Sequence, residues 1–230
     1  KPCATPGAAA CSPMNKWMRR ASAALALSAG AASACAAQAS EAQWIAAAQH
    51  AITFGKAHGL AIDLEVVHGN GLSGHTPIGV WSENGRCTLV VSARDNPTAA
   101  RLADMIEPGL IDLFLHGAAM HEVGHCYRRL NGYPHNEKLS PLVSWLAPMR
   151  SWFSRRIRTE EVFADMTEVA WLARYHPERF DAMLGQIRRV RARFLEPKHD
   201  TLAWIDAAQA NRAAETEGNV FQHAERLMLR

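Results

Sequence analysis

Apolar and polar residues follow two different periods along the chain, and the change of period separates an early region of strands from a mainly helical remainder. Apolar residues spaced three and four apart, as on one helix face, predict helices at 41–57, 97–107, 110–130, 158–174, 178–195 and 200–214, with a charged helix from about 217. Runs rich in β-branched residues predict strands at 60–67, 79–82 and 86–92. The predicted fold class is therefore α+β, with a small N-terminal sheet ahead of a mainly helical body.

Local signals mark the ends of several of these elements. The Asn-Gly pair at 84–85 separates the last two predicted strands and favours a tight hairpin turn. Asn-Pro at 96–97 is typical of a helix start, and Asn-Gly at 131–132 is typical of a helix end. Gly124 lies inside a predicted helix, where glycine costs roughly 1 kcal/mol relative to alanine. This cost indicates that another segment of backbone passes close to Gly124.

The segment 121–125, with the sequence HEVGH, lies in the helix predicted over 110–130. Side chains four residues apart lie one above the other on a helix, so His121 and His125 point to one place. Glu122 is rotated by about 100° from His121 around the helix axis and lies beside that place. A zinc peptidase needs two imidazoles that hold the metal and a carboxylate that takes a proton from the zinc-bound water.

Two carboxylates in the helix predicted over 158–174 add to this pattern. Glu161 and Asp165 are four residues apart and share a face. One can complete a His-His-Glu zinc site, while the other accepts the spare N–H of a liganding imidazole. Glu160 is the competing ligand, but it has Ala164 and not a carboxylate four residues later, so Glu161 is preferred. The alternative is that these histidines and acidic residues form solvent-exposed helix faces.

The two segments HEVGH (121–125) and EVFAD (161–165) together resemble the gluzincin metallopeptidases, whose pattern is HExxH followed by ExxxD, and look most like the HExGH and ExxAD branch of that group. The resemblance covers residues 110–175. It implies a zincin-like fold, one Zn²⁺ ion and a peptide or protein substrate. The residues that match the pattern one for one are His121, Glu122, His125, Glu161 and Asp165.

The resemblance also implies a role for each matching residue. The metal ligands are His121, His125 and Glu161. Glu122 is the catalytic base that accepts a proton and passes it to the leaving amine. Asp165 lies behind a liganding imidazole and orients it.

Two further parts of such a site have weaker signals in the sequence. In zincins an edge strand pairs with extended substrate by β-augmentation, and the strand predicted at 86–92 is the candidate edge. A second hydrogen-bonding group must help the metal to hold the oxyanion. Tyr133, His135 and His176 are candidates because they fall near the ligand segments, although none of them lies in a matching motif.

The ligand set leaves functions of different classes open. The first is an exported zinc peptidase, and the second is a zinc-stabilised, catalytically idle domain that binds a partner. Glu122 favours the enzyme, because a closed structural zinc site has no need of a carboxylate beside its first histidine. A zinc amidase that acts on non-protein amides would use the same chemistry.

The beginning of the chain predicts export. Residues 1–13 show no periodic apolar pattern and are interpreted as a non-native or over-extended leader. Residues 14–36 have a positive start, a short alanine-rich core and an A-x-A-like end, which predict a secretory signal peptide. One domain, 41–230, remains, and it is expected to be periplasmic or secreted. Cys35 could instead carry a lipid, but Ala32 stands where a lipoprotein signal prefers leucine.

Charge and hydropathy exclude some partners. The formal charge of +3 falls to −1 without Lys1, Lys16, Arg19 and Arg20, the four charged residues of the predicted leader and signal peptide, which contain no acidic residue. The mature chain is close to neutral, so no nucleic acid is expected as a partner. It has no stretch that predicts a transmembrane helix. Residues 142–158 are rich in Trp and Leu with a basic end, and they could form a flap or contact a membrane surface, although such stripes are more often core packing.

Cys87 and Cys126 are the two cysteines that follow the predicted signal peptide. A pair of cysteines in an oxidising compartment suggests one disulfide, here between a predicted strand and the metal-binding helix. Two free buried thiols are the first alternative. The second makes Cys87 a zinc ligand, as in the peptide deformylases, but export and the better-placed Glu161 argue against it.

The helix predicted at 178–195 carries a run of basic residues. They are interpreted as a solvated face with its counter-charges. The residues concerned are Arg188, Arg189, Arg191 and Arg193.

Overall fold

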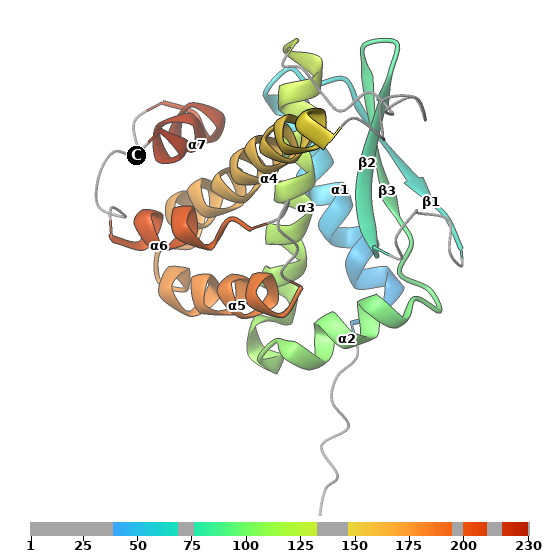
Figure 1. Cartoon of the computed structure of the whole chain (residues 1–230). Coiled ribbons are helices and arrows are strands. Elements are labelled where there is room, and N and C mark those ends of the chain that lie inside the picture. The colour runs from blue at the N-terminus through green and yellow to red at the C-terminus, as the bar shows by residue number, and fades with distance from the viewer. Residues whose placement is uncertain (1–38, 69–75, 133–146, 195–199, 211–217, 230) are drawn as a thin grey trace, which may run out of the picture. The chain divides into compact units, whose positions relative to one another are not determined.

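The computed structural model of the chain describes residues 39–68, 76–132, 147–194, 200–210 and 218–229, with the side chains of 147–156 left out. Three strands, β1 (Ile62–Val66), β2 (Ile78–Glu83) and β3 (Arg86–Val91), form one sheet. The helices are α1 (Glu41–Ala57), α2 (Pro97–Met105), α3 (Ile111–Leu130), α4 (Ala147–Tyr175), α5 (Phe180–Arg193), α6 (Leu202–Ala210) and α7 (Val220–Met228), with a short 3₁₀ turn, η1 (Pro108–Leu110), before α3 (Figure 1). The mixed α+β class and the small early sheet are confirmed.

Several predictions lie outside the described residues. These include the leader at 1–13, the signal peptide at 14–36 and the lipid-modified Cys35. The first part of the proposed membrane-contacting segment 142–158 also lies outside them. Within the described part of the chain, no helix combines the length and the apolar character that crossing a bilayer requires.

The sheet has the order β1-β3-β2, with β1 parallel and β2 antiparallel to β3. The predicted hairpin is confirmed: Asn84 and Gly85 join β2 to β3 with φ of 52° and 73°, the positive angles that a two-residue hairpin turn requires. The prediction that 86–92 is a substrate-binding edge is wrong. Because β1 pairs with the other side of β3, starting at Ile62 opposite Cys87, the exposed edges belong to β1 and β2.

A side-chain cap fixes the start of α2, as the sequence predicts. The Asn96 side chain accepts hydrogen bonds from the backbone N–H groups of residues 98 and 99, and Pro97 takes the first position of α2. After the C-terminal end of α3, Gly132 has a φ of 76°, the left-handed conformation that often ends a helix. Helix α4 begins at Ala147 and not at 158, and it accepts Pro148 in its first turn, where no N–H is needed.

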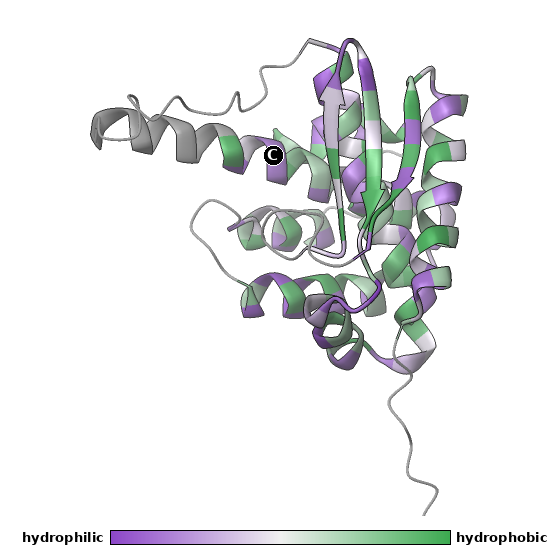
Figure 2. Ribbon diagram, turned by 90° about the vertical axis from the view of Figure 1, so that its right-hand side faces the viewer, coloured by the Kyte–Doolittle hydropathy of each residue, from purple (hydrophilic) through white to green (hydrophobic). Residues whose placement is uncertain are grey.

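Helix α3 is the centre of the hydrophobic core. It packs against α1 and the sheet on one side and against α4 on the other (Figures 1 and 2). Its Met120 and Val123 are fully buried, together with Trp44 of α1, Leu89 of β3 and Phe163 of α4. The helix that carries the HEVGH segment is therefore packed on several sides, which fixes the positions of the site residues on it.

Gly124 is the point of closest approach between α3 and α4. A Cβ atom at this position would lie 2.9 Å from the Cα of Ala164 and 2.9 Å from Oγ1 of Thr167. The Thr167 hydroxyl donates to the carbonyl of Phe163, so it is itself fixed. The prediction of a close backbone at Gly124 is confirmed, and the neighbour is the backbone of α4.

Cys87 of β3 and Cys126 of α3 form a disulfide with a Cα–Cα distance of 5.7 Å. Both are fully buried. The predicted strand-to-helix disulfide is confirmed in the structure, and the reading of Cys87 as a zinc ligand is wrong because its sulfur is bonded to another sulfur.

We expect Gly124→Ala to lower the free energy of unfolding by about 1–3 kcal/mol, because a methyl group there overpacks a rigid contact with the α4 backbone. Gly185→Ala in α5 is the matched control, since a Cβ at that position meets nothing within 4 Å. It should raise the free energy of unfolding by up to about 1 kcal/mol through helix propensity. Urea denaturation of both variants measures the difference, and an equal effect at the two positions would contradict the close-contact explanation.

Reduction of the disulfide should lower the free energy of unfolding by about 4 kcal/mol, since the bond closes a loop of 39 residues in the unfolded chain. The measurement is urea denaturation with and without dithiothreitol. The Cys87→Ala/Cys126→Ala double variant serves as the control, because reductant should leave its midpoint unchanged. Identical midpoints of the wild-type protein in both conditions would show that the thiols are not bonded in solution.

Candidate metal centre

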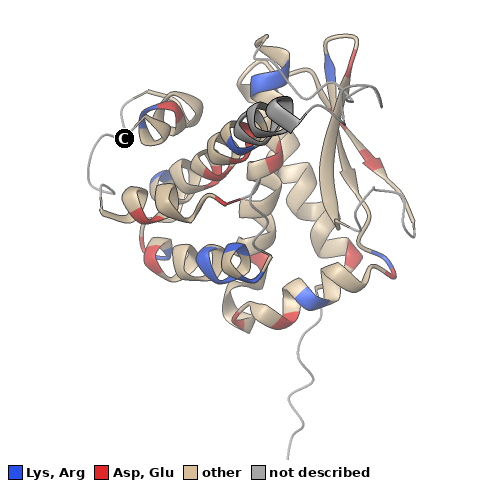
Figure 3. Cartoon of the chain, in the orientation of Figure 1, with Lys and Arg blue, Asp and Glu red and all other residues tan. Residues whose placement is uncertain are grey.

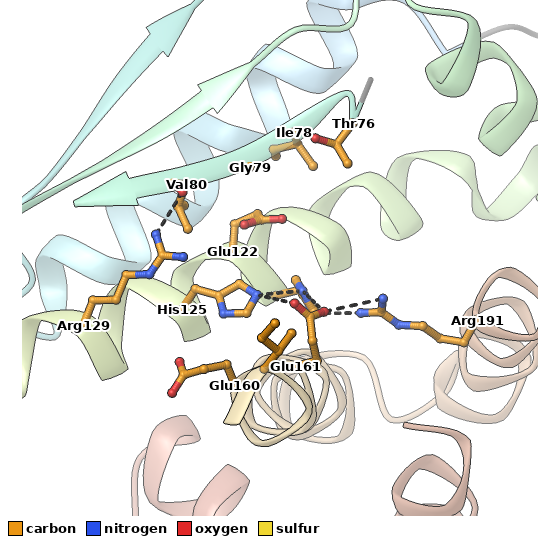
Figure 4. A pocket seen from close by; sticks show the side chains of 12 residues that line it. Thr76, Ile78, Gly79, Val80, Glu122, His125, Arg129, Glu160, Glu161 and Arg191 are labelled. Atoms are coloured by element: carbon orange, nitrogen blue, oxygen red, sulfur yellow. Dashed lines mark hydrogen bonds and ion pairs between the residues drawn. The ribbon is translucent and has the colours of Figure 1, made fainter. Parts of the chain in front are cut away.

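Three side chains from two helices, two buried and one partly buried, converge on one point. His121 and His125 project from one face of α3, with their Nε2 atoms 3.2 Å apart. Glu161 of α4 places its carboxylate oxygens 3.7 Å from Nε2 of His121 and 3.6 Å from Nε2 of His125. Figure 4 shows Glu161 turned toward the imidazole of His125. The three residues brought together are the predicted metal ligands.

The spacing of these atoms fits a tetrahedral ion. Zinc bonds of about 2.0–2.1 Å at tetrahedral angles place ligand atoms about 3.3 Å apart, and the three measured separations lie between 3.2 and 3.7 Å. Neutral imidazole and carboxylate are also the donor types that zinc takes. His121, His125 and Glu161 therefore form a group that could hold a metal ion.

Asp165 of α4 lies behind His121, as predicted. Its Oδ1 is 2.8 Å from Nδ1 of His121, so the N–H at Nδ1 is donated to the carboxylate and Nε2 is left to face the other ligands. The hydroxyl of Thr201 donates to Oδ2 at 2.5 Å. Arg191 of α5 donates to Oδ1. Asp165 is fully buried, and these partners satisfy both of its oxygens.

The surroundings of the two histidines shift their pKa values in opposite directions. Burial acts to lower the pKa of His121, but the hydrogen bond and the charge of Asp165 outweigh it and raise that pKa to about 9. For His125, burial dominates and lowers the pKa to about 3. Burial would raise the pKa of Asp165, but Arg191 and His121 lower it to about 2. His125 is thus neutral at pH 7, and Asp165 is a permanent anion.

Glu122 lies beside the ligands and is not one of them. Its half-buried side chain lines a cavity of about 260 Å³ together with His121, His125 and Glu161. Burial raises the pKa of the Glu122 carboxyl, and the charge of Glu161 raises it further. A carboxylate with a raised pKa, next to a metal site and open to a cavity, is suited to accept and return a proton.

Strand β2 forms the opposite wall of this cavity. Ile78, Gly79 and Val80 line it (Figure 4). Arg129, near the end of α3, donates from Nη1 to the carbonyl of Val80 at 2.9 Å. This bond fixes the edge strand β2 relative to the helix that carries both imidazoles.

Arg191 is the site residue that the sequence interpretation missed. It was assigned to a solvated face of α5, whose basic positions appear in Figure 3, and that assignment is wrong for Arg191. Its Nη1 is 3.8 Å from Glu161, and its Nη2 is 3.2 Å from Nδ1 of His121. The signal was available, because Arg191 follows Leu184 and Ile187 on the buried stripe of α5 at helical spacing.

The other candidate residues do not form part of the candidate metal centre or are not described. Glu160 is turned away from the imidazoles (Figure 4) and forms a buried ion pair with Arg128, 2.9 Å from its Nε, so the preference for Glu161 agrees with the structure. His176 packs on the ring of Trp171, about 20 Å further along the helix axis than Glu161. It does not reach the site, so its assignment as an oxyanion or proton donor is wrong. Tyr133 and His135 lie outside the described residues.

A second carboxylate, Glu168, lies one turn beyond Asp165 on α4. Glu168 is 4% exposed, and its Oε1 has no hydrogen-bond partner among the described residues. Burial, followed by the charge of Asp165, raises its pKa to about 7. It has room because residue 117 of α3 is glycine: a Cβ there would overlap the Glu168 carboxylate. His121, Asp165 and Glu168 also form a close group, but the guanidinium of Arg191 already occupies Asp165.

Comparison of the chain with protein-family models, with curated proteins and with solved structures found no match.

We expect Glu168→Gln to stabilise the protein at high pH and to have little effect at low pH. An unfolded Glu ionises near its ordinary pKa of 4.5, whereas the folded protein resists ionisation up to about pH 7. The penalty is therefore absent below pH 4.5, grows between 4.5 and 7, and reaches about 3 kcal/mol above that range. Urea denaturation of metal-free protein at pH 5 and pH 8 measures it.

Glu65→Gln is the control for this comparison, because Glu65 is exposed on β1. Its effect on the free energy of unfolding should be small and similar at the two pH values. A gain from Glu168→Gln that does not increase between pH 5 and pH 8 would contradict the burial of an unpaired carboxyl at this position.

Proposed function

We propose that the chain is a zinc-dependent metallopeptidase with a zincin-like site, in which His121, His125 and Glu161 hold the metal. The observation that carries this proposal is the position of Glu122. It lines the same cavity as the three ligands, and yet it belongs to neither group of residues that could hold an ion. A carboxylate left over beside an open metal site is what hydrolysis requires and what a purely structural site does not.

When bound, Zn²⁺ supplies Lewis-acid chemistry, since it acidifies water and polarises a carbonyl. Glu122 accepts the proton of the attacking water on its carboxylate and then donates it to the leaving nitrogen. His125 is neutral and can ligate directly. Asp165 keeps the Nδ1–H of His121 in place, so the same tautomer is presented throughout the cycle. Arg191 positions Asp165 and lies close to Glu161.

The substrate is expected to bind as an extended peptide along β2. This strand has an edge that is not paired with β3, and its residues Ile78, Gly79 and Val80 line the cavity opposite the ligands. An extended peptide adds to such an edge through backbone hydrogen bonds. Arg129 keeps β2 at a fixed distance from Glu122, which aligns the added chain with the base.

The buried disulfide supports the proposed export, because disulfides persist in oxidising compartments such as the periplasm and the extracellular space. A zinc amidase on non-protein amides shares every element of the site except the use of β2, and it would not need a strand edge. A catalytically idle binding domain would not need Glu122. The strand edge and Glu122 together therefore favour a peptidase.

We expect Glu122→Gln to retain one zinc ion per chain and to lower the rate of peptide hydrolysis by at least about 100-fold, the usual contribution of a general base. His121→Ala and Glu161→Ala should lose the metal and the activity together, whereas Glu65→Gln should lose neither. Metal analysis of the purified proteins and a casein or peptide-library assay make the comparison. Equal hydrolysis by Glu122→Gln and the wild type would reject the proposed function.

A further inference from the structure

A second cavity, of about 160 Å³, adjoins the metal centre. It shares Thr76, Ile78, His121, Glu122 and Arg191 with the first cavity, so the two spaces meet at the catalytic carboxylate. A cavity of about 150 Å³ accommodates a molecule the size of benzene. This one therefore has room for one long side chain of a substrate whose backbone lies along β2.

The walls of the second cavity are mainly apolar, apart from the polar residues that it shares with the first cavity and the buried carboxyl of Glu168. We call it the Glu168 pocket, and define it by Trp44, Ile78, Phe114, Ile187, Val190 and Glu168. The apolar residues come from four different elements, and they would pack along a hydrocarbon stem. A pocket that binds only apolar groups would not need the carboxyl of Glu168.

The unpaired carboxyl of Glu168 is costly without a ligand. An unsatisfied buried acceptor loses its hydrogen bonds to water without replacement, and an ionised one loses more. Gly117 of α3 leaves the space that the Glu168 carboxyl of α4 occupies. Oε1 of this carboxyl has no hydrogen-bond partner among the described residues. A ligand that brings its own donor would remove that cost.

The local charge determines which kind of donor fits. Two carboxylates, Glu122 and Glu168, line the pocket together with one guanidinium, Arg191. Arg191 is already engaged by Asp165. Oε1 of Glu168 has no donor among the described residues, so an aliphatic stem that ends in a cation would complement both the apolar walls and this carboxyl.

We propose that the Glu168 pocket binds a lysine or arginine side chain of the substrate, at a position adjacent to the cleaved bond, with Glu168 as the counter-ion. This inference rests on the proposed function. The zinc ligands alone do not select among substrate side chains, and the Glu168 pocket would add a preference for basic residues. Glu168 is thus a specificity residue and takes no part in the proton transfers.

The test measures binding without hydrolysis. Zinc-loaded Glu122→Gln protein is titrated with hexapeptides of alanine in which lysine, arginine or norleucine is placed at each position in turn. Norleucine keeps the aliphatic stem of lysine and lacks its charge. We expect one position at which lysine and arginine bind at least about 10-fold more tightly than norleucine, a difference of about 1.4 kcal/mol.

In the Glu122→Gln/Glu168→Gln variant this preference should disappear, and in Glu122→Gln/Glu65→Gln it should remain. The thermal midpoint of each variant confirms folding. A preference for norleucine, a preference for tyrosine or glutamine in a second peptide series, a lysine preference that survives Glu168→Gln, or no binding of any peptide would each overturn the proposal.

A cleavage-site profile of the wild-type enzyme on a mixed peptide library provides the second measurement, which does not depend on any Glu168 variant. Basic residues should be enriched at one position next to the cleaved bond. Hydrolysis without that enrichment would overturn the Glu168 pocket and leave the peptidase proposal intact. Selective binding of lysine peptides without hydrolysis by the wild type would do the reverse.

Discussion

The close approach of α3 and α4 is the constraint on which the rest of the site depends. Because residue 124 has no side chain, the backbone of Ala164 can lie against the turn that separates His121 from His125. About two turns earlier on α3, Gly117 leaves the space that the Glu168 carboxyl occupies. Two helices of ordinary composition would pack 8–10 Å apart, and each increment in that distance would carry Glu161 away from the imidazoles.

A buried polar network then fixes the orientation of the ligands. Asp165 is its centre, and it accepts from His121 on α3, Arg191 on α5 and Thr201 just before α6. Three elements are thus tied to one carboxylate that lies on α4. Such networks confer a single arrangement only when every member is satisfied. Two of the buried described atoms that lack a hydrogen-bond partner, Nδ1 of His125 and Oε1 of Glu168, belong to residues that line the two cavities.

Most of the local structure followed from the sequence, and much of what failed was non-local. The α1 helix, the 84–85 turn, the Asn96 cap and the disulfide were predicted because each depends on a short pattern or on a pair of cysteines. The strand order was not, since the pairing of β1 with β3 depends on contacts between residues far apart in the chain.

The same division holds within the site. The candidate ligands, Glu122 and Asp165 stand at fixed spacings on two helices, so the sequence could predict that they lie together. Arg191 and Glu168 were not identified, because their positions in the site depend on how α5 and α4 meet α3 in space. A charged residue on an otherwise apolar helix stripe is the signal that marks Arg191. Gly117 gave no comparable signal, since its purpose appears only once the Glu168 side chain is placed beside it.

The Cys87–Cys126 bond lies entirely within the earlier half of the fold and ends one residue after His125. Both imidazoles and Glu122 therefore belong to a covalently closed unit of strand and helix. Glu161, Asp165 and Arg191 all come later in the chain. The loop closed by the disulfide therefore keeps the segment with both imidazoles next to β3, whether or not α4 and α5 are packed against it.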